Sequence, residues 1–292
     1  MLLFFPEEEG LARRLAAATG LEAAPIERHR FPDGEIKLRL PERLPEKVVL
    51  LRGLDRPNEK LVELLLASAG LHEAGVRRIV LVAPYFPYLR QDKAFAPGEV
   101  ASAFVVGRFV ASCVEALVTV DPHLHRIARL DEAVPVTPAL ALCAAPLLGE
   151  LAARERGRPL LVGPDEESRA WVEAAAHASG LEYAVGRKER RGDRDVAVTL
   201  PEGLNVRGRA AVVLDDVAST GRTLAQAVRA LRSAGAATVD VAVTHALFVE
   251  DALETVRAAG AGAIWSTDTI AHPTNAVSVA PLIAQALAAL LR

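Results

Sequence analysis

The chain has 292 residues, of which 51% are hydrophobic, so it is long enough to form two domains with substantial cores. Its formal net charge of -3 argues against a large nucleic-acid-binding surface, and no apolar run reaches the length of a membrane span. Two cysteines without Cys-x-x-Cys spacing predict neither a zinc site nor a disulfide framework, which favours a cytoplasmic protein.

The first half of the chain predicts alternating strands and helices. Residues 1–5 are apolar but lack a basic flank, which favours a first strand over a signal peptide. A Pro-Asp-Gly turn signal at residues 31–35 joins two short strands within residues 25–40. The other expected elements are helices at 8–19, 59–74 and 99–112, and strands at 47–52, 78–83 and 116–120.

The second half repeats this order. Residues 48–51 and 211–214 each begin a strand, loop and helix, followed by Ala-Gly and a further strand at nearly equal spacing. We therefore predict an α/β protein with two similar domains, 1–147 and 148–292, each a mostly parallel sheet flanked by helices. The second-half elements are strands at 160–163, 182–187, 195–200, 210–214 and 238–245, and helices at 166–179, 223–233 and 280–291, the last packing back across the domain boundary.

A carboxylate pair and a hydroxyl-rich loop form the most informative stretch. Asp215 and Asp216 follow a buried strand, and the loop leads into a helix at Leu224. A strand, a tight loop and a helix N-terminus cradle phosphate, while the carboxylates suit sugar hydroxyls or a metal bound to them. The pattern indicates a ribose 5-phosphate site, although a plain strand-loop-helix connection is the alternative. The loop residues are Ser219, Thr220, Gly221, Arg222 and Thr223. The corresponding loop of the first domain, residues 53–58, has no acid pair or hydroxyl run.

Three other polar segments follow predicted strands, at the edge where α/β folds bind ligands. Arg90, Gln91 and Asp92 offer a guanidinium fork, an amide and a carboxylate for phosphate or nucleotide binding. In Asp121-Pro-His-Leu-His125, either imidazole could ligate a metal or donate to phosphate, or be structural. Asp165 could bind Mg²⁺ or nucleotide, or could cap a helix.

Two predicted hairpins complete the candidate residues. Phe31, Asp33, Gly34 and Glu35 place an aromatic ring and two carboxylates on one turn, which could equally be a solvated turn. Lys188 and Arg190 lie in a charged stretch between two strands of a chain with few lysines. Such cations could close over phosphates and stabilise phosphoryl-transfer charge, or lie on a solvated hairpin tip.

The acid pair and its loop resemble the phosphoribosyl-diphosphate (PRPP) binding motif of type I phosphoribosyltransferases. The order of all the motifs resembles the ribose-phosphate diphosphokinase (PRPP synthetase) family, over nearly the whole chain. That order is Phe-Pro-Asp-Gly-Glu, Arg-Gln-Asp-Lys, Asp-Pro-His, Pro-Asp, Lys-x-Arg and Asp-Asp-x-x-Ser-Thr-Gly. The Arg-Gln-Asp-Lys form and the short length look most like the archaeal-type branch. The resemblance implies two phosphoribosyltransferase-like domains, the first with a degenerate phosphate loop.

The resemblance also implies an activity and residue roles. Such enzymes transfer the diphosphoryl group of Mg-ATP to the C1 hydroxyl of ribose 5-phosphate, releasing AMP. Asp215, Asp216 and residues 219–223 would then bind ribose 5-phosphate, and His123 and Asp165 would serve Mg²⁺-ATP. The resemblance further implies a homo-oligomer, a dimer or a multiple of dimers, whereas the absence of nucleic-acid and membrane partners is predicted from the charge and the apolar runs above. ATP would be bound by Arg90, Gln91 and Asp92, its adenine by Phe31, Asp33, Gly34 and Glu35 from a neighbouring subunit, and the transferred group by Lys188 and Arg190.

Two departures from the family pattern keep rival functions open. Glu166-Glu167-Ser168 stands where the family has small residues, and Arg222 replaces a glycine. One rival is a phosphoribosyltransferase that consumes PRPP, which explains the 215–223 stretch but not residues 90–92 or 121–123. The other is a non-catalytic regulatory paralogue. Retention of Lys188 and Arg190 favours an active enzyme.

Overall fold

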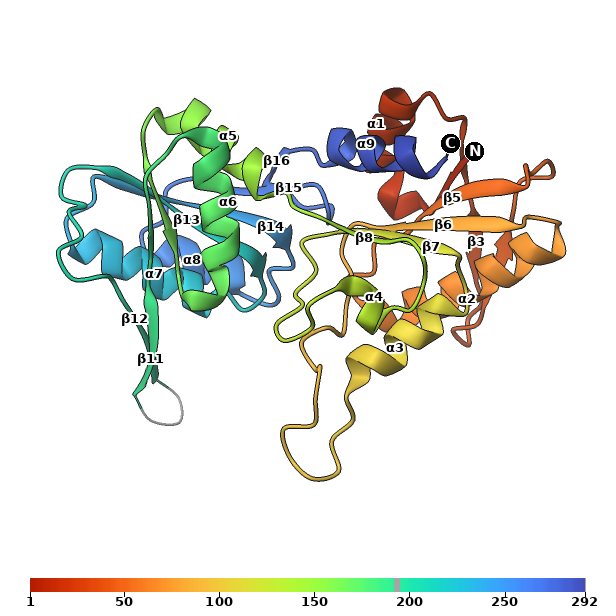
Figure 1. Ribbon diagram of the computed structural model, residues 1–292, viewed down its shortest axis with the longest axis horizontal. Coiled ribbons are helices and arrows are strands. Elements are labelled where there is room, and N and C mark those ends of the chain that lie inside the picture. The colour runs from red at the N-terminus through yellow and green to blue at the C-terminus, as the bar shows by residue number, and fades with distance from the viewer. Residues whose placement is uncertain (192–194, 292) are drawn as a thin grey trace. The chain divides into compact units, whose positions relative to one another are not determined.

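The computed structural model describes residues 1–191 and 195–291, without the side chains of residues 189–191 and 195–197. Its contacts divide it into two units: Met1–Leu142 with Val279–Arg292, and Cys143–Ser278. Each unit contains a six-stranded sheet flanked by helices (Figure 1), so the predicted fold class is confirmed. The boundary between the two phosphoribosyltransferase-like domains, which the sequence analysis places between residues 147 and 148, stays a prediction.

The first unit is built on a fully parallel sheet with the strand order β2-β1-β5-β6-β7-β8. Its central strands are apolar on both faces because helices cover both sides. The strands are β1 (Leu2–Phe4), β2 (Ala23–Pro25), β5 (Lys47–Leu51), β6 (Arg78–Ala83), β7 (Ala116–Val120) and β8 (Ala139–Leu142). The helices are α1 (Glu9–Thr19), preceded by the 3-10 turn η1 (Pro6–Glu8), α2 (Pro57–Glu73), α3 (Ser102–Ala111), α4 (Leu130–Ala133) and α9 (Ala280–Leu290).

The second unit repeats this topology with the order β10-β9-β13-β14-β15-β16, again parallel throughout. Alternate residues of β13 enter different cores: Ala211 and Val213 pack towards α7 and α8, whereas Val212 and Leu214 pack towards α5 and α6. The strands are β9 (Leu160–Gly163), β10 (Tyr183–Val185), β13 (Ala210–Ala218), β14 (Thr238–Ala246), β15 (Ile264–Thr267) and β16 (Asn275–Val277). The helices are α5 (Ala145–Arg156), α6 (Arg169–Ser179), preceded by the 3-10 turn η2 (Glu166–Ser168), α7 (Arg222–Ser233) and α8 (Ala252–Ala258).

Each unit carries an antiparallel hairpin at the same place in its topology. In the first unit β3 (Glu27–Arg30) pairs with β4 (Ile36–Arg39), between β2 and β5. In the second unit β11 (Arg187–Arg191) pairs with β12 (Asp195–Thr199), between β10 and β13. Figure 1 shows β11 and β12 extending beyond the helices of their unit. The first hairpin was expected from the sequence. For the second, the sequence predicts one strand over 182–187 followed by a charged connection, but β10 ends at Val185 and Lys188 lies within β11, because residues 187–191 pair with 195–199.

Strand β13 differs from its prediction in a way that matters for the site. The sequence predicts that this strand ends at residue 214, before the acid pair, but it continues through Asp215 and Asp216 to Ala218. Pairing with the equally long strand β14 explains the extension, because Asp215 lies opposite Val243 and Val217 opposite His245. The carboxylates are therefore held by a sheet rather than by a loop. Within the described residues, no helix is both long and apolar enough to cross a bilayer.

Candidate active site

The phosphate loop of the second unit joins β13 to α7. Gly221 precedes the helix with a φ of 69°, and a Cβ atom there would lie 2.8 Å from the carbonyl oxygen of Ala252. Only glycine fits this position without strain. The loop is also tied to the following segment, since the amides of Phe248 and Val249 donate to the carbonyls of Ala218 and Ser219. As in any α-helix, the first backbone amides of α7 have no carbonyl acceptor within the helix, so this end of the helix suits an anion.

Three carboxylates gather beside this loop. Asp216 is buried, and its backbone amide donates to Oδ1 of Asp215 at 3.0 Å. Burial raises the pKa of Asp215 well above its ordinary value, and the charges of Asp216 and Asp165 raise it further. A bound cation or sugar hydroxyls would relieve this repulsion.

Asp165 has two roles in the structure. Its Oδ1 accepts from the amides of Glu167 and Ser168 at 3.1 and 3.4 Å, which confirms the helix-cap alternative. Its Oδ2 lies 3.9 Å from Nζ of Lys188, so one of the two predicted phosphate-stabilising cations reaches the carboxylate cluster. The side chain of Arg190 lies outside the described residues. Glu166, one of the departures from the family pattern, pairs with Arg169 at 2.9 Å.

In the first unit, Arg90, Gln91 and Asp92 lie on the loop between β6 and α3. Arg90 is exposed, whereas Asp92 is buried and accepts a hydrogen bond from Arg126. Burial would raise the pKa of Asp92, but the hydrogen bond and charge of Arg126 outweigh this and lower it. Among the described residues, Oδ2 of Asp92 has no partner. Asp92 therefore joins this loop to the segment after β7.

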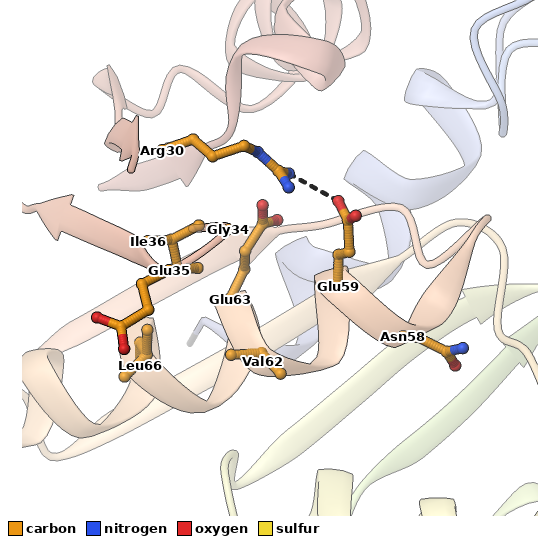
Figure 2. A pocket seen from close by; sticks show the side chains of 9 residues that line it. All are labelled: Arg30, Gly34, Glu35, Ile36, Asn58, Glu59, Val62, Glu63 and Leu66. Atoms are coloured by element: carbon orange, nitrogen blue, oxygen red, sulfur yellow. Dashed lines mark hydrogen bonds and ion pairs between the residues drawn. The ribbon is translucent and has the colours of Figure 1, made fainter. Parts of the chain in front are cut away.

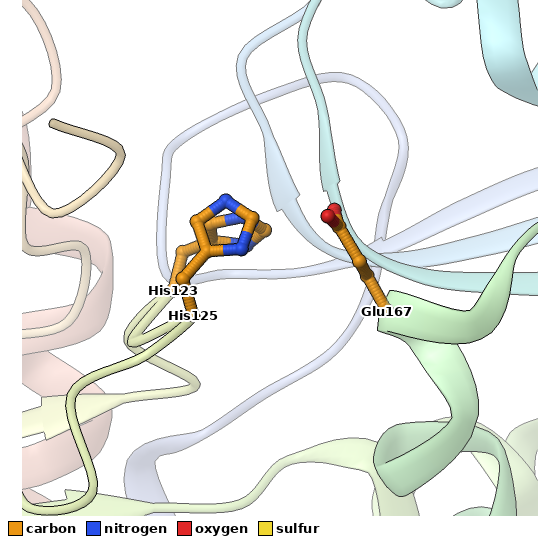
Figure 3. Close-up of side chains that lie close together, drawn as sticks. All are labelled: His123, His125 and Glu167. Carbon is orange, nitrogen blue, oxygen red and sulfur yellow. The ribbon is translucent and has the colours of Figure 1, made fainter. Parts of the chain in front are cut away.

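His123 and His125 lie on the segment after β7, with their Nε2 atoms 2.9 Å apart (Figure 3). Asp121 and His125 both have positive φ values, of 37° and 41°, which is uncommon for residues other than glycine and frequent at functional sites. The amide of Asp121 is held by the carbonyl of Leu142 at 2.8 Å. The strained segment thus places two imidazole nitrogens where one cation could bind both.

The β3–β4 turn carries the predicted adenine residues. Phe31 is 38% exposed, and Gly34 has a φ of 94°. The carboxylate of Asp33 accepts from the amide of Glu35 at 3.1 Å and so shapes the turn. A pocket of about 460 Å³ lies between the hairpin and α2 (Figure 2). It is lined by Arg30, Gly34, Glu35, Ile36, Asn58, Glu59, Val62, Glu63 and Leu66.

The structure thus brings some predicted site residues together and leaves others in separate segments. In the second unit, Asp165, Lys188 and Asp215 approach one another. In the first unit, the hairpin residues, the 90–92 loop and His123 occupy three segments. The sequence reasoning overlooked Glu8, Arg52 and Glu63, which form a buried ion cluster. The available signal was a charged residue, Arg52, at the end of the buried strand predicted over residues 47–52.

Two parallel sheets of equal topology, one carrying the acid pair and phosphate loop, define a protein of two phosphoribosyltransferase-type domains. A model of the N-terminal domain of ribose phosphate pyrophosphokinase matches residues 1–115, and a phosphoribosyl transferase domain matches residues 137–257. The chain belongs to the ribose-phosphate pyrophosphokinase family, whose enzymes are diphosphotransferases. The resemblance seen in the motifs is confirmed.

Similar proteins cover nearly the whole chain. The ribose-phosphate pyrophosphokinase of Methanopyrus kandleri is 39% identical over 280 residues, covering 95% of this chain and 94% of its own. That of Methanosarcina acetivorans is 37% identical over 284 residues, covering 97% of each. The crystal structure of phosphoribosylpyrophosphate synthetase from Mycobacterium smegmatis matches with a TM-score of 0.83 at 26% identity, covering 100% of this chain and 98% of that one.

Proposed function

We propose that this protein transfers the diphosphoryl group of Mg-ATP to the C1 hydroxyl of ribose 5-phosphate, giving PRPP and AMP for nucleotide biosynthesis. One observation carries the proposal: the acid pair at the end of β13 leads into the phosphate loop at the N-terminus of α7. An anion-binding helix end beside sugar-binding carboxylates suits a phosphorylated pentose. Asp215 and Asp216 would hold the ribose hydroxyls, and the 5-phosphate would be bound by Ser219, Thr220, Gly221, Arg222 and Thr223.

The carboxylate cluster fits Mg²⁺, a hard cation that prefers oxygen ligands. Asp165 would hold the metal, and His123 would likewise serve Mg²⁺-ATP. Bound Mg²⁺ would neutralise phosphate charge on ATP and on the transferred group. The raised pKa of Asp215 supports a cation beside this cluster, because positive charge there would favour the ionised carboxylate.

The reaction needs no side-chain nucleophile. The C1 hydroxyl oxygen forms a bond to the β-phosphorus of ATP, the bond from that phosphorus to the α–β bridging oxygen breaks, and AMP leaves with that oxygen. The hydroxyl proton is released to solvent. Lys188 and Arg190 would stabilise the charge on the transferred group, which is where fixed cations accelerate phosphoryl transfer most. The position of Lys188 near Asp165 supports this role.

ATP would bind through residues of the first domain. Arg90 and Gln91 would contact the phosphates or ribose, with Asp92 beside them. Phe31, Asp33, Gly34 and Glu35 would contact adenine from a neighbouring subunit of a homo-oligomer. The exposure of Phe31 supports this, because the ring is available for stacking. A cytoplasmic location is part of this proposal, because two cysteines without Cys-x-x-Cys spacing do not form a disulfide framework.

Phosphorus NMR of the purified protein with ribose 5-phosphate, ATP and Mg²⁺ tests the proposal. AMP and PRPP should appear in equal amounts, and Lys188→Ala should reduce their formation by roughly a hundredfold or more. ADP in place of AMP would mean a simple kinase. If neither product forms, consumption of PRPP with a nucleobase, or ATP binding without turnover, would support the phosphoribosyltransferase or regulatory alternative.

A further inference from the structure

The two units differ most where their shared topology predicts a ligand site. Strand β5 occupies the same place in the first sheet as β13 does in the second. Val48 and Leu50 face the helix core on the α2 side, as Ala211 and Val213 do on the α7 side. Aligning residues 48–51 with 211–214 therefore puts Arg52 at the position of Asp215. A carboxylate of the proposed sugar site is replaced by a cation in the first unit.

Arg52 is almost completely buried, with 1% of its surface exposed. Its Nη1 donates to both carboxylate oxygens of Glu8, at 2.9 and 3.0 Å, and its Nη2 donates to Glu63. The guanidinium lies 4.4 Å from the ring centre of Phe5, and the amide of Gly53 also donates to Glu8 at 3.2 Å. Protein charges thus occupy the place in the first unit that corresponds to the sugar site of the second.

The same ion cluster reaches the β3–β4 hairpin through Glu63 on α2. One oxygen of Glu63 accepts from Arg52, and the other accepts from Nη1 of Arg28 on β3 at 2.6 Å. Arg28 also donates to Glu7. One turn earlier on α2, Glu59 accepts from Arg30 at 2.7 Å (Figure 2). Two arginines on one strand of the hairpin are therefore bound to two glutamates on one face of α2.

We infer that Arg28 and Glu63 are positioning residues, which clamp the β3–β4 hairpin to α2 so that its turn presents Phe31, Asp33 and Glu35 to the nucleotide in one orientation. The degenerate site of the first domain has become the anchor of its own hairpin. The topologically equivalent hairpin of the second unit carries Lys188, whose contact with Asp165 is partly exposed and 3.9 Å long. A hairpin held in one orientation suits the binding of the adenine base, which does not change during the proposed reaction. The nucleotide role of the turn rests on the proposed function.

Arg28→Met is the informative variant, because it removes the Arg28–Glu63 clamp and leaves the Arg52–Glu8 and Arg30–Glu59 pairs in place. Glu63→Gln, which also weakens the contact with Arg52, serves as a second variant. Arg39→Gln is the matched control, since it removes the exposed Arg39–Glu27 pair from the same hairpin. Amide hydrogen exchange of residues 27–39 reports the clamp without requiring catalysis. Steady-state kinetics with ATP and ribose 5-phosphate report its effect on the substrate.

We expect faster exchange of residues 27–39 in Arg28→Met and an increase in KM for ATP of roughly tenfold, with kcat and KM for ribose 5-phosphate little changed. Arg39→Gln should behave as the unaltered protein. Unchanged exchange would overturn the clamp, and faster exchange with an unchanged KM for ATP would overturn the positioning role. If the unaltered protein forms no AMP but exchange still accelerates, the clamp holds and the proposed function fails.

Discussion

Gly221 shows how one residue limits what the phosphate loop can tolerate. Its φ of 69° belongs to the left-handed region, and its α-carbon faces the backbone of α8 at Ala252. A side chain there meets a carbonyl oxygen, which cannot move without shifting that helix. The glycine is therefore required both by backbone conformation and by close approach.

Gly221→Ala should weaken ribose 5-phosphate binding and lower stability. We expect the free energy of unfolding to fall by about 1–3 kcal/mol and KM for ribose 5-phosphate to rise roughly tenfold or more, with KM for ATP little affected. Denaturant unfolding and steady-state kinetics measure these effects. Gly203→Ala is the control, because Gly203 has a φ of 75° but open space at its α-carbon. Equal losses of stability in the two variants would show that close packing at Gly221 contributes nothing.

At the scale of elements, the ion cluster around Arg52 joins η1, the end of β5, α2 and β3. It contains more carboxylates than guanidinium groups, and most of it is buried. Burial raises the pKa of Glu8 to about 7, although the charge of Arg52 opposes the shift. Glu8 therefore titrates in the folded protein near neutral pH, whereas an unfolded chain would lose this proton near pH 4.5.

This shift predicts a pH dependence of stability with a definite sign. Between pH 4.5 and 7 the folded protein retains a proton that the unfolded chain has lost, so the contribution of Glu8 to stability decreases as pH rises. The total change is about 3 kcal/mol. Denaturant unfolding between about pH 4.5 and pH 8 should therefore show a steeper loss of stability in the unaltered protein than in Glu8→Gln.

The exposed neighbouring substitution, Glu9→Gln, is the control for this experiment and should leave the pH dependence as it is. Parallel stability curves for the unaltered protein and Glu8→Gln would contradict the assignment of the titration to Glu8. The measurement also reports on the hairpin clamp, because Arg52 connects Glu8 to Glu63 and through it to Arg28.

Strand and helix periodicity made the order of the main elements predictable. Residues 79–83 are all apolar, and apolar residues recur at helical spacing within 223–233; both segments formed the expected elements. The sequence reasoning overlooked strands β2, β8, β11, β15 and β16 and helices α4, α5 and α8. The segment containing β8 and the start of α5, residues 139–145, consists mainly of alanine and leucine, so neither β-branched residues nor polar spacing distinguishes strand from helix there.

At the scale of the whole molecule, the internal duplication made both the fold and much of the candidate site predictable. The acid pair and its loop form a local pattern, so Asp215 to Thr223 could be recognised from the sequence. The hairpin clamp could not, because Arg28 and Glu63 are 35 residues apart and each resembles an ordinary surface charge in its own segment. Contacts of that kind are set by the tertiary structure.

The end of the chain provides the last prediction. Helix α9 follows the second unit in sequence but belongs to the first, where it packs on α1, with Ile283 and Leu287 fully buried. Each unit has its own cores, so loosening α9 should open the first unit without opening the second. Leu287→Ala should cost about 2–5 kcal/mol of stability. Hydrogen exchange should accelerate in α1 and β1 and stay unchanged in β13 and β14.

Leu231→Ala is the matched control, because Leu231 is equally buried but lies on α7 in the second unit. It should accelerate exchange in β13 and β14 and leave α1 and β1 as they are. Equal acceleration throughout the chain in either variant would mean that the two units unfold as one. In that case the two units, although similar in topology, would share a single cooperative unfolding transition.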